Sequence, residues 1–101
     1  MDIKQERIRV AYSKIARDPD WTLTNDTKVF DANQTSIIRV FEHPSGQAAV
    51  YAMSSTDGKT SKAALSAVFD VAEAIPLIAA EAGCVAEATE AALAKMGHVR
   101  A

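Results

Sequence analysis

The chain has little of several residue types that define specialised protein classes. Its 101 residues include one cysteine, four glycines, three prolines and one tryptophan. A single cysteine excludes an internal disulfide framework, and so few glycines and prolines exclude collagen-like and low-complexity chains. The formal net charge of −2 lacks the positive excess of proteins that coat nucleic acids. The composition is typical of one small globular domain spanning residues 1–101.

Long apolar runs are also missing. The most apolar stretch, residues 72–85, contains Glu73, Glu81, Pro76 and Gly83, so it is too short and too charged to cross a bilayer. The N-terminal residues include acidic side chains and lack the apolar core of a signal peptide. Together with the single thiol, these features predict a soluble cytoplasmic protein without membrane partners.

Alanine, in contrast, is abundant. Of the 49 apolar residues, 20 are alanine, and valine and isoleucine together supply only 15. The remaining larger side chains can form the core of one small domain, but they leave little room for a buried catalytic cavity. This composition favours a binding protein over an enzyme.

Hydrophobic periodicity predicts an α+β domain. In residues 2–17, apolar side chains from Ile8 to Ile15 recur at the spacing of one helical face, and Asp18-Pro19 ends this helix. Residues 36–53 predict a β-hairpin, because β-branched residues flank a Pro-Ser-Gly turn. Apolar residues point to both faces of its first strand, so we expect both faces to be covered.

The segments around this hairpin are predicted as follows. Two short strands are expected at 21–24 and 27–30, on either side of an Asn-Asp turn. From residue 61 onward the spacing predicts two or three alanine-rich helices, with Pro76 breaking or kinking the first of them. Gly97 is expected just beyond the last helix. The expected fold is an N-terminal helix, a small antiparallel sheet centred on 36–53, and C-terminal helices.

The first helix is distinctly basic and is a candidate binding surface. Its segment carries five cations against two carboxylates, whereas carboxylates outnumber cations in the C-terminal half. Such asymmetry orients a protein toward an acidic partner or toward phosphates. The predicted partner-binding residues are Arg7, Lys14 and Arg17, with Trp21 as an aromatic anchor. A solvated helix face, and a Trp21 that packs between helix and sheet, are the alternatives.

Two further surfaces are candidates. Gly58, Lys59, Thr60 and Lys62 would form an anion site if a helix begins there, although Met53 occupies the position where a phosphate-binding loop needs glycine. A capped helix start is the alternative. Apolar residues around Pro76 predict a homodimer interface formed by Ile75, Leu77, Ile78 and Val85, with an intramolecular helix pair as the alternative.

Metal-ligating and nucleophilic patterns do not emerge from the sequence. His43, Cys84 and His98 lie in different segments without metal-ligand spacing, and no glycine-flanked serine is present. We therefore expect no cofactor, no metal and no catalytic residues.

The sequence thus favours a non-catalytic module that binds a larger protein as a regulator or inhibitor. Accessory proteins of phages and plasmids share this size and composition. A protein that contacts nucleic acid through the first helix is the alternative, and a small enzyme or anion-binding protein using residues 58–62 is the third hypothesis.

Overall fold

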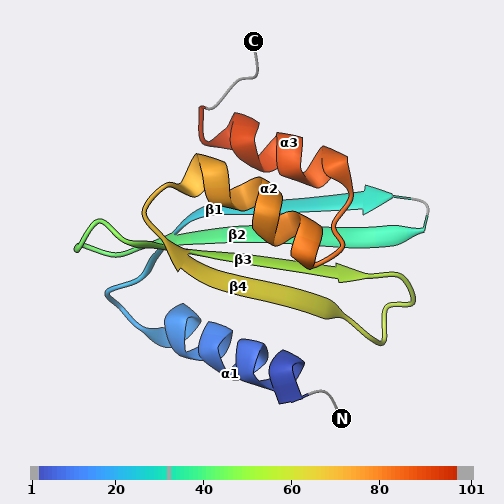
Figure 1. Ribbon diagram of the computed structural model, residues 1–101, viewed down its shortest axis with the longest axis horizontal. Coiled ribbons are helices and arrows are strands. Elements are labelled where there is room, and N and C mark those ends of the chain that lie inside the picture. The colour runs from blue at the N-terminus through green and yellow to red at the C-terminus, as the bar shows by residue number, and fades with distance from the viewer. Residues whose placement is uncertain (1–2, 32, 98–101) are drawn as a thin grey trace.

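The computed structural model describes residues 3–31 and 33–97, and the element order is one helix, four strands and two helices (Figure 1). The elements are α1 (Ile3–Arg17), β1 (Thr22–Asp31), β2 (Gln34–Glu42), β3 (Ala48–Ser55), β4 (Lys62–Val68), α2 (Val71–Glu81) and α3 (Ala86–Lys95). The predicted α+β architecture is confirmed, with an N-terminal helix, an antiparallel sheet and two C-terminal helices. His98, one of the three residues considered as metal ligands in the sequence analysis, lies outside the described residues.

The four strands form an antiparallel sheet in the order β1-β2-β3-β4, so each strand pairs with its neighbour in the chain. The predicted 36–53 hairpin provides its two central strands, with Val40 opposite Val50. At the turn, the His43 N–H donates to the Gln47 carbonyl (2.9 Å). Gly46 adopts a φ of +92°, which side-chain-bearing residues rarely adopt.

Two strands differ from the prediction. Residues 62–68, expected to be helical, form β4, because pairing with β3 overrides the helix propensity of alanine and buries Ala64. Residues 22–31 form one strand in place of two short ones. The expected turn at Asn25 is instead an irregularity between Leu23 and Asn25 within β1, and the ladder continues past it.

The helix that contains Pro76 is also shorter and more regular than expected. It begins only at Val71, where the Asp70 side chain accepts a hydrogen bond from the Glu73 N–H (3.1 Å). Pro76 lies inside α2 and does not end it. The helix ends near Gly83, which adopts a φ of +75° as the predicted second break. Gly97 likewise follows α3 with positive φ, as predicted.

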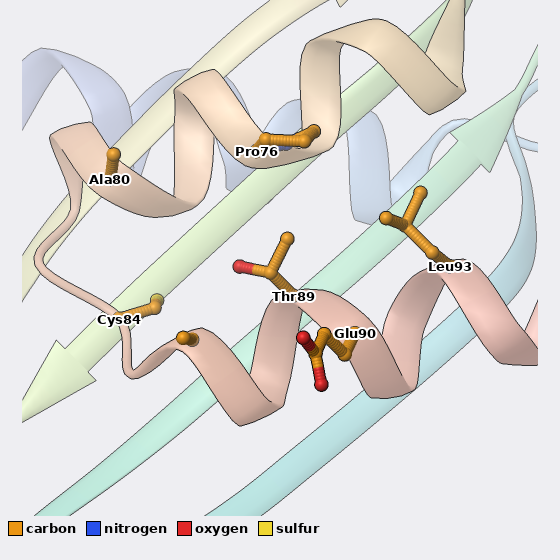
Figure 2. A pocket seen from close by; sticks show the side chains of 7 residues that line it. Pro76, Ala80, Cys84, Thr89, Glu90 and Leu93 are labelled. Atoms are coloured by element: carbon orange, nitrogen blue, oxygen red, sulfur yellow. The ribbon is translucent and has the colours of Figure 1, made fainter. Parts of the chain in front are cut away.

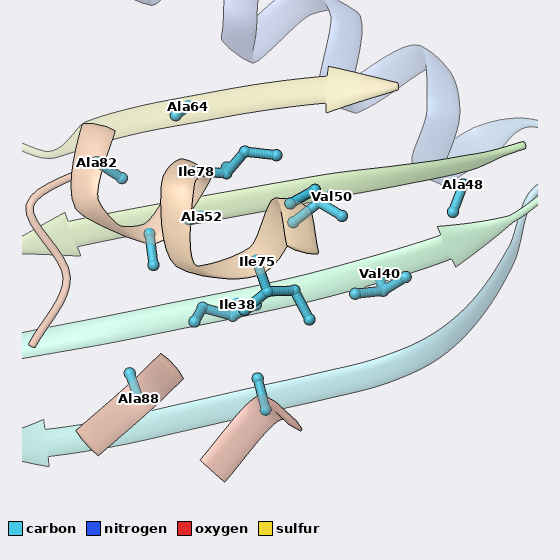
Figure 3. Packing of buried hydrophobic residues seen from close by; sticks show 13 residues of the cluster. Ile38, Val40, Ala48, Val50, Ala52, Ala64, Ile75, Ile78, Ala82 and Ala88 are labelled. Atoms are coloured by element: carbon cyan, nitrogen blue, oxygen red, sulfur yellow. The ribbon is translucent and has the colours of Figure 1, made fainter. Parts of the chain in front are cut away.

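Helices α2 and α3 cover one face of the sheet, and the core lies between these layers (Figures 1 and 3). Its largest fully buried apolar side chains are Ile38, Ile75, Val40 and Val50. Alanines fill most of the remaining core on both layers. Because alanine has a single methyl group, it lets the helices approach the sheet closely while still excluding water. The abundant alanine is therefore a packing feature of this fold.

Buried polar side chains of the sheet bind the C-terminal ends of both covering helices. Ser54 Oγ donates to the Ala82 carbonyl after α2 (2.6 Å), and Asn25 Nδ2 donates to the Ala92 carbonyl in the last turn of α3 (2.8 Å). Carbonyls in the last turn of a helix lack an intrahelical partner, so these side chains satisfy groups that would otherwise be buried unpaired.

A third buried polar side chain acts at the start of α3. Ser36 Oγ accepts a hydrogen bond from the N–H of Val85, the N-cap residue (3.1 Å), where the cap residue itself offers no side-chain acceptor. The sheet therefore supplies the missing cap. These contacts fix where each helix lies along the strands.

Candidate interaction surface on the first helix

Helix α1 contacts the sheet mainly along β4, on the side away from α2 and α3 (Figure 1). The Tyr12 ring stacks on Tyr51 at a centroid distance of 4.0 Å and meets Phe41 edge-on at 5.9 Å. Both Gln5 amide atoms bond the main chain of Ala63 in β4. This confirms that apolar residues on the second face of the hairpin are covered, but no described residue of α1 is fully buried.

A polar network anchors the inner side of α1. Arg39 Nη1 donates to the Tyr12 hydroxyl (2.6 Å), and Arg39 Nε donates to the Asp26 carboxylate (3.1 Å). Burial opposes the charge on Arg39, but these bonds outweigh it and raise the pKa of the guanidinium. Burial, followed by the neighbouring Tyr12, raises the pKa of Tyr51. These groups therefore hold the helix in place as a cation and a neutral phenol.

The outer side of α1 carries five exposed residues that we call the outer stripe: Ile3, Arg7, Val10, Lys14 and Arg17. Their spacing of three and four residues places them on one side of the helix. Ile3 is 66% exposed and Val10 is 47% exposed. The three predicted partner-binding cations of α1 thus lie together, beside two exposed apolar residues that the sequence analysis did not single out. The seven-residue spacing of Ile3 and Val10 places them on the same side of a helix, and this spacing could have identified them from the sequence.

The cations of the outer stripe differ from others on the same helix. Lys4 forms an ion pair with Glu81 (3.4 Å), and Arg9 forms one with Glu6. Within residues 3–31 and 33–97, no carboxylate forms an ion pair with a cation of the outer stripe. A shallow hollow of about 370 Å³ lies against the stripe, lined by Arg9, Val10, Ser13, Lys14 and Arg17. The stripe therefore combines charge, apolar area and a depression.

Trp21 lies beyond the end of α1, next to the turn between β2 and β3. Its indole packs against the His43 ring at a centroid distance of 4.9 Å and an interplanar angle of 55°. The side chain is half-buried. Trp21 is therefore neither a core residue nor a fully exposed anchor, and its role in partner binding remains a prediction.

The predicted anion site at 58–62 loses its structural basis. Lys62 begins a strand, so no helix N-terminus is present there. The Asp57 carboxylate instead accepts hydrogen bonds from the N–H groups of Lys59 (2.8 Å) and Thr60 (2.7 Å), and from the Thr60 hydroxyl. The helix-start expectation is wrong because residues 62–68 pair with β3. The main-chain donors that an anion would use are bound to the chain's own carboxylate.

This loop gives a testable pH dependence. The Thr60 N–H, then the Lys59 N–H and the Thr60 hydroxyl, lower the pKa of Asp57 to about 2. Because the folded pKa is lowered, the stabilisation of the loop is present above the ordinary carboxyl pKa and is lost as pH falls through about 2. We expect NMR titration of the Asp57 carboxyl, and of the Lys59 and Thr60 amides, to give this midpoint. A midpoint near that of an ordinary exposed aspartate would contradict the loop geometry.

The four residues predicted for a dimer interface are not on one surface. Ile75 and Ile78 are buried in the core, and Val85 packs against it. Only Leu77 of the four is largely exposed, at 69%. The helical spacing of α2 explains this, since a helix turns Ile75 and Ile78 toward the sheet and Leu77 away from it. Ile75 and Ile78 therefore pack within the same chain, as in the alternative of intramolecular helix packing, and they cannot contribute to a dimer interface.

An apolar groove of about 290 Å³ runs between α2 and α3 (Figure 2). Pro76 and Ala80 line it from α2, and Thr89 and Leu93 from α3, with Cys84 near its end. Burial raises the pKa of the Cys84 thiol, and its Sγ bonds the Met53 carbonyl (3.5 Å). The thiol is therefore held protonated and is a poor nucleophile.

Two further kinds of site are absent from the described part of the chain. Within it, no three His, Cys, Asp or Glu side chains are grouped to hold a metal ion. None of its helices combines the length and apolar character needed to span a membrane. Comparisons with protein-family models, curated proteins and solved structures found no match to this chain.

Proposed function

We propose that this protein is a non-catalytic interaction module that binds a larger, acidic protein through the outer stripe of α1 and thereby regulates or inhibits it. The observation that carries the proposal is the combination of exposed Ile3 and Val10 with three cations that have no ion-pair partner among the described residues. Apolar area supplies affinity when it is buried, and the cations select and orient an acidic partner.

The docking of α1 supports this role. The inner side of the helix is held by the Tyr12 stack and by the Gln5 amide, so the outer stripe is presented on an ordered element without contributing to the core. Substitutions in the stripe should therefore affect binding and leave folding intact. A surface dedicated to binding can be changed without loss of folding stability, and the outer stripe is expected to meet this requirement.

The experiment compares two double variants. Arg7→Glu with Lys14→Glu reverses the stripe, whereas Lys59→Glu with Lys62→Glu reverses an equal number of exposed cations outside the stripe, at the start of β4 and in the loop before it. Each protein is used for cross-linked capture from its source cells, and the recovered partner is then purified and its affinity measured. We expect the stripe variant to bind at least about tenfold more weakly, because like charges then face the partner. The control variant should bind normally, and both should keep their melting temperature.

Other outcomes would overturn the proposal. If both double variants retain the partner, the binding surface lies elsewhere. If the recovered ligand is nucleic acid and its affinity falls steeply with salt, the alternative hypothesis of phosphate contacts by α1 is supported. A partner whose binding depends on the stripe but only weakly on salt supports an interface with a substantial apolar part.

A further inference from the structure

The two edge strands of the sheet, β1 and β4, differ in how their outward main-chain groups are bonded. At the β4 edge, Gln5 Oε1 accepts from the Ala63 N–H (2.7 Å) and Gln5 Nε2 donates to the Ala63 carbonyl (3.0 Å), while α1 lies alongside. This side-chain clamp imitates a neighbouring strand. At the β1 edge, Lys95 Nζ donates to the Asp26 carbonyl (2.7 Å), and no described strand lies beyond. β1 is thus the longer and more open edge.

The contacts at both edges fix which main-chain groups point outward. The carbonyl of Asp26 and both main-chain groups of Ala63 face away from the sheet. In an antiparallel pair, successive residues point their main-chain groups alternately toward and away from the partner strand. When this alternation is followed from Ala63 through the registers of β3 and β2, it predicts that the main-chain groups of Asp26 point outward, in agreement with its bond to Lys95. The outward N–H and carbonyl groups of β1 therefore belong to Asp26, Lys28 and Phe30.

The exposed side chains along β1 form a self-complementary pattern. Thr22, Thr24 and Asp31 are exposed as well, but the pattern is set by four other exposed residues. Leu23, Asp26, Lys28 and Phe30 give an apolar residue, an acid, a base and an apolar residue in that order. Phe30 is 73% exposed and Leu23 is 46% exposed. When two copies of this strand pair antiparallel, the acid of each copy lies opposite the base of the other, and the apolar residues at the ends come together.

We propose that β1 pairs with β1 of a second copy of this chain, antiparallel and with the two-fold axis at Thr27, to give a continuous eight-stranded sheet. Asp26 then lies opposite Lys28 of the second copy, and the reverse pair forms by symmetry. Both residues point their main-chain groups outward, as a hydrogen-bonded antiparallel pair requires. Each Phe30 packs near Leu23 of the second copy, and a main-chain N–H replaces Lys95 as the donor to the Asp26 carbonyl.

The charge pattern selects a second copy over an unrelated strand. An unrelated peptide could satisfy the main-chain groups equally well, whereas a second copy of β1 also supplies the matching charges and apolar ends. The proposed interface uses neither the outer stripe of α1 nor Leu77, so it stands independently of the proposed function.

The first test measures mass by analytical ultracentrifugation over a wide concentration range. We expect twice the 10.8 kDa monomer mass at high concentration. Lys28→Pro removes one outward N–H while sparing the bonds between β1 and β2, so it should abolish the dimer and preserve the fold. Lys28→Ala is the control, and it should weaken dimerisation far less.

The second test exchanges charges between copies. Asp26→Lys alone and Lys28→Asp alone each place like charges opposite one another and should weaken self-association by about tenfold or more. An equimolar mixture of the two variants restores both opposite-charge pairs, so a mixed dimer should form. Circular dichroism checks that each variant is folded, because Asp26 also bonds Arg39.

Two results would overturn the proposal. The first is a wild-type protein that stays monomeric at every concentration. The second is a dimer that survives Lys28→Pro. If that surviving dimer is lost in Leu77→Ser, association is assigned to the outer side of α2.

Discussion

Replacing Val40 by aspartate is expected to unfold the domain. Val40 is fully buried on β2, opposite Val50 and beneath the covering helices (Figure 3). The substitution removes apolar contacts and places a carboxyl group within the buried apolar cluster between the sheet and the helices. We expect a loss of roughly 4–5 kcal/mol or more in the free energy of unfolding. That loss is comparable with the whole stability of many small domains, about 5–15 kcal/mol.

Chemical denaturation followed by circular dichroism measures this effect. Val10→Asp is the matched control, because it makes the same chemical change at a residue that is 47% exposed on α1. Its effect on the free energy of unfolding should stay within about 0.5 kcal/mol, as for most surface substitutions. A cooperative, near-wild-type transition for Val40→Asp would contradict the assignment of this face of β2 to the core.

The substitution Asn25→Asp is expected to produce a large, pH-dependent destabilisation. Asn25 is 4% exposed, and its amide donates to the Ala92 carbonyl while its oxygen accepts from the Thr27 hydroxyl. A carboxylate of nearly the same shape keeps the bond from Thr27 but cannot donate to Ala92. A buried carboxylate facing a carbonyl should cost about 3 kcal/mol or more at neutral pH.

The sign of the pH dependence follows from the burial of the new carboxyl. Burial raises its folded pKa above the unfolded value of about 3.9. The destabilisation is therefore greatest at neutral pH and shrinks as pH falls toward about 3.9, where the protonated acid donates to Ala92. The measurement is the difference in unfolding free energy from wild type across this pH range. Asn33→Asp, at an exposed position, is the control, and a pH-independent difference for Asn25→Asp would contradict the assigned hydrogen bond.

The accuracy of the sequence predictions depended on whether local signals determine each element. The 36–53 hairpin was predictable because its strands are rich in β-branched residues and its turn contains proline and glycine. β4 was not, because Ala63, Ala64 and Leu65 favour a helix in isolation and only pairing with β3 makes them a strand. The tertiary environment decided that segment.

The same distinction applies to the candidate surfaces. The exposed cations of α1 could be predicted, since charge and helical spacing are local properties. The role of Asn25 could not, because asparagine beside aspartate is typical of a turn, and its partner Ala92 lies in a helix 67 residues away in sequence. The error at Ile75 and Ile78 has a related origin, because α2 packs on β3 and β4, and β4 was expected to be helical.

The order of elements along the chain has a consequence for biosynthesis. Each strand pairs with the strand made just before it, so the sheet can assemble progressively as the chain is synthesised. The cover of its core face, α2 and α3, is made last. Until residues 71–95 have left the ribosome, Ile38, Val40 and Val50 lack that cover, and the nascent sheet is prone to bind chaperones or other chains. Completion of the two alanine-rich helices then closes the core in one late step.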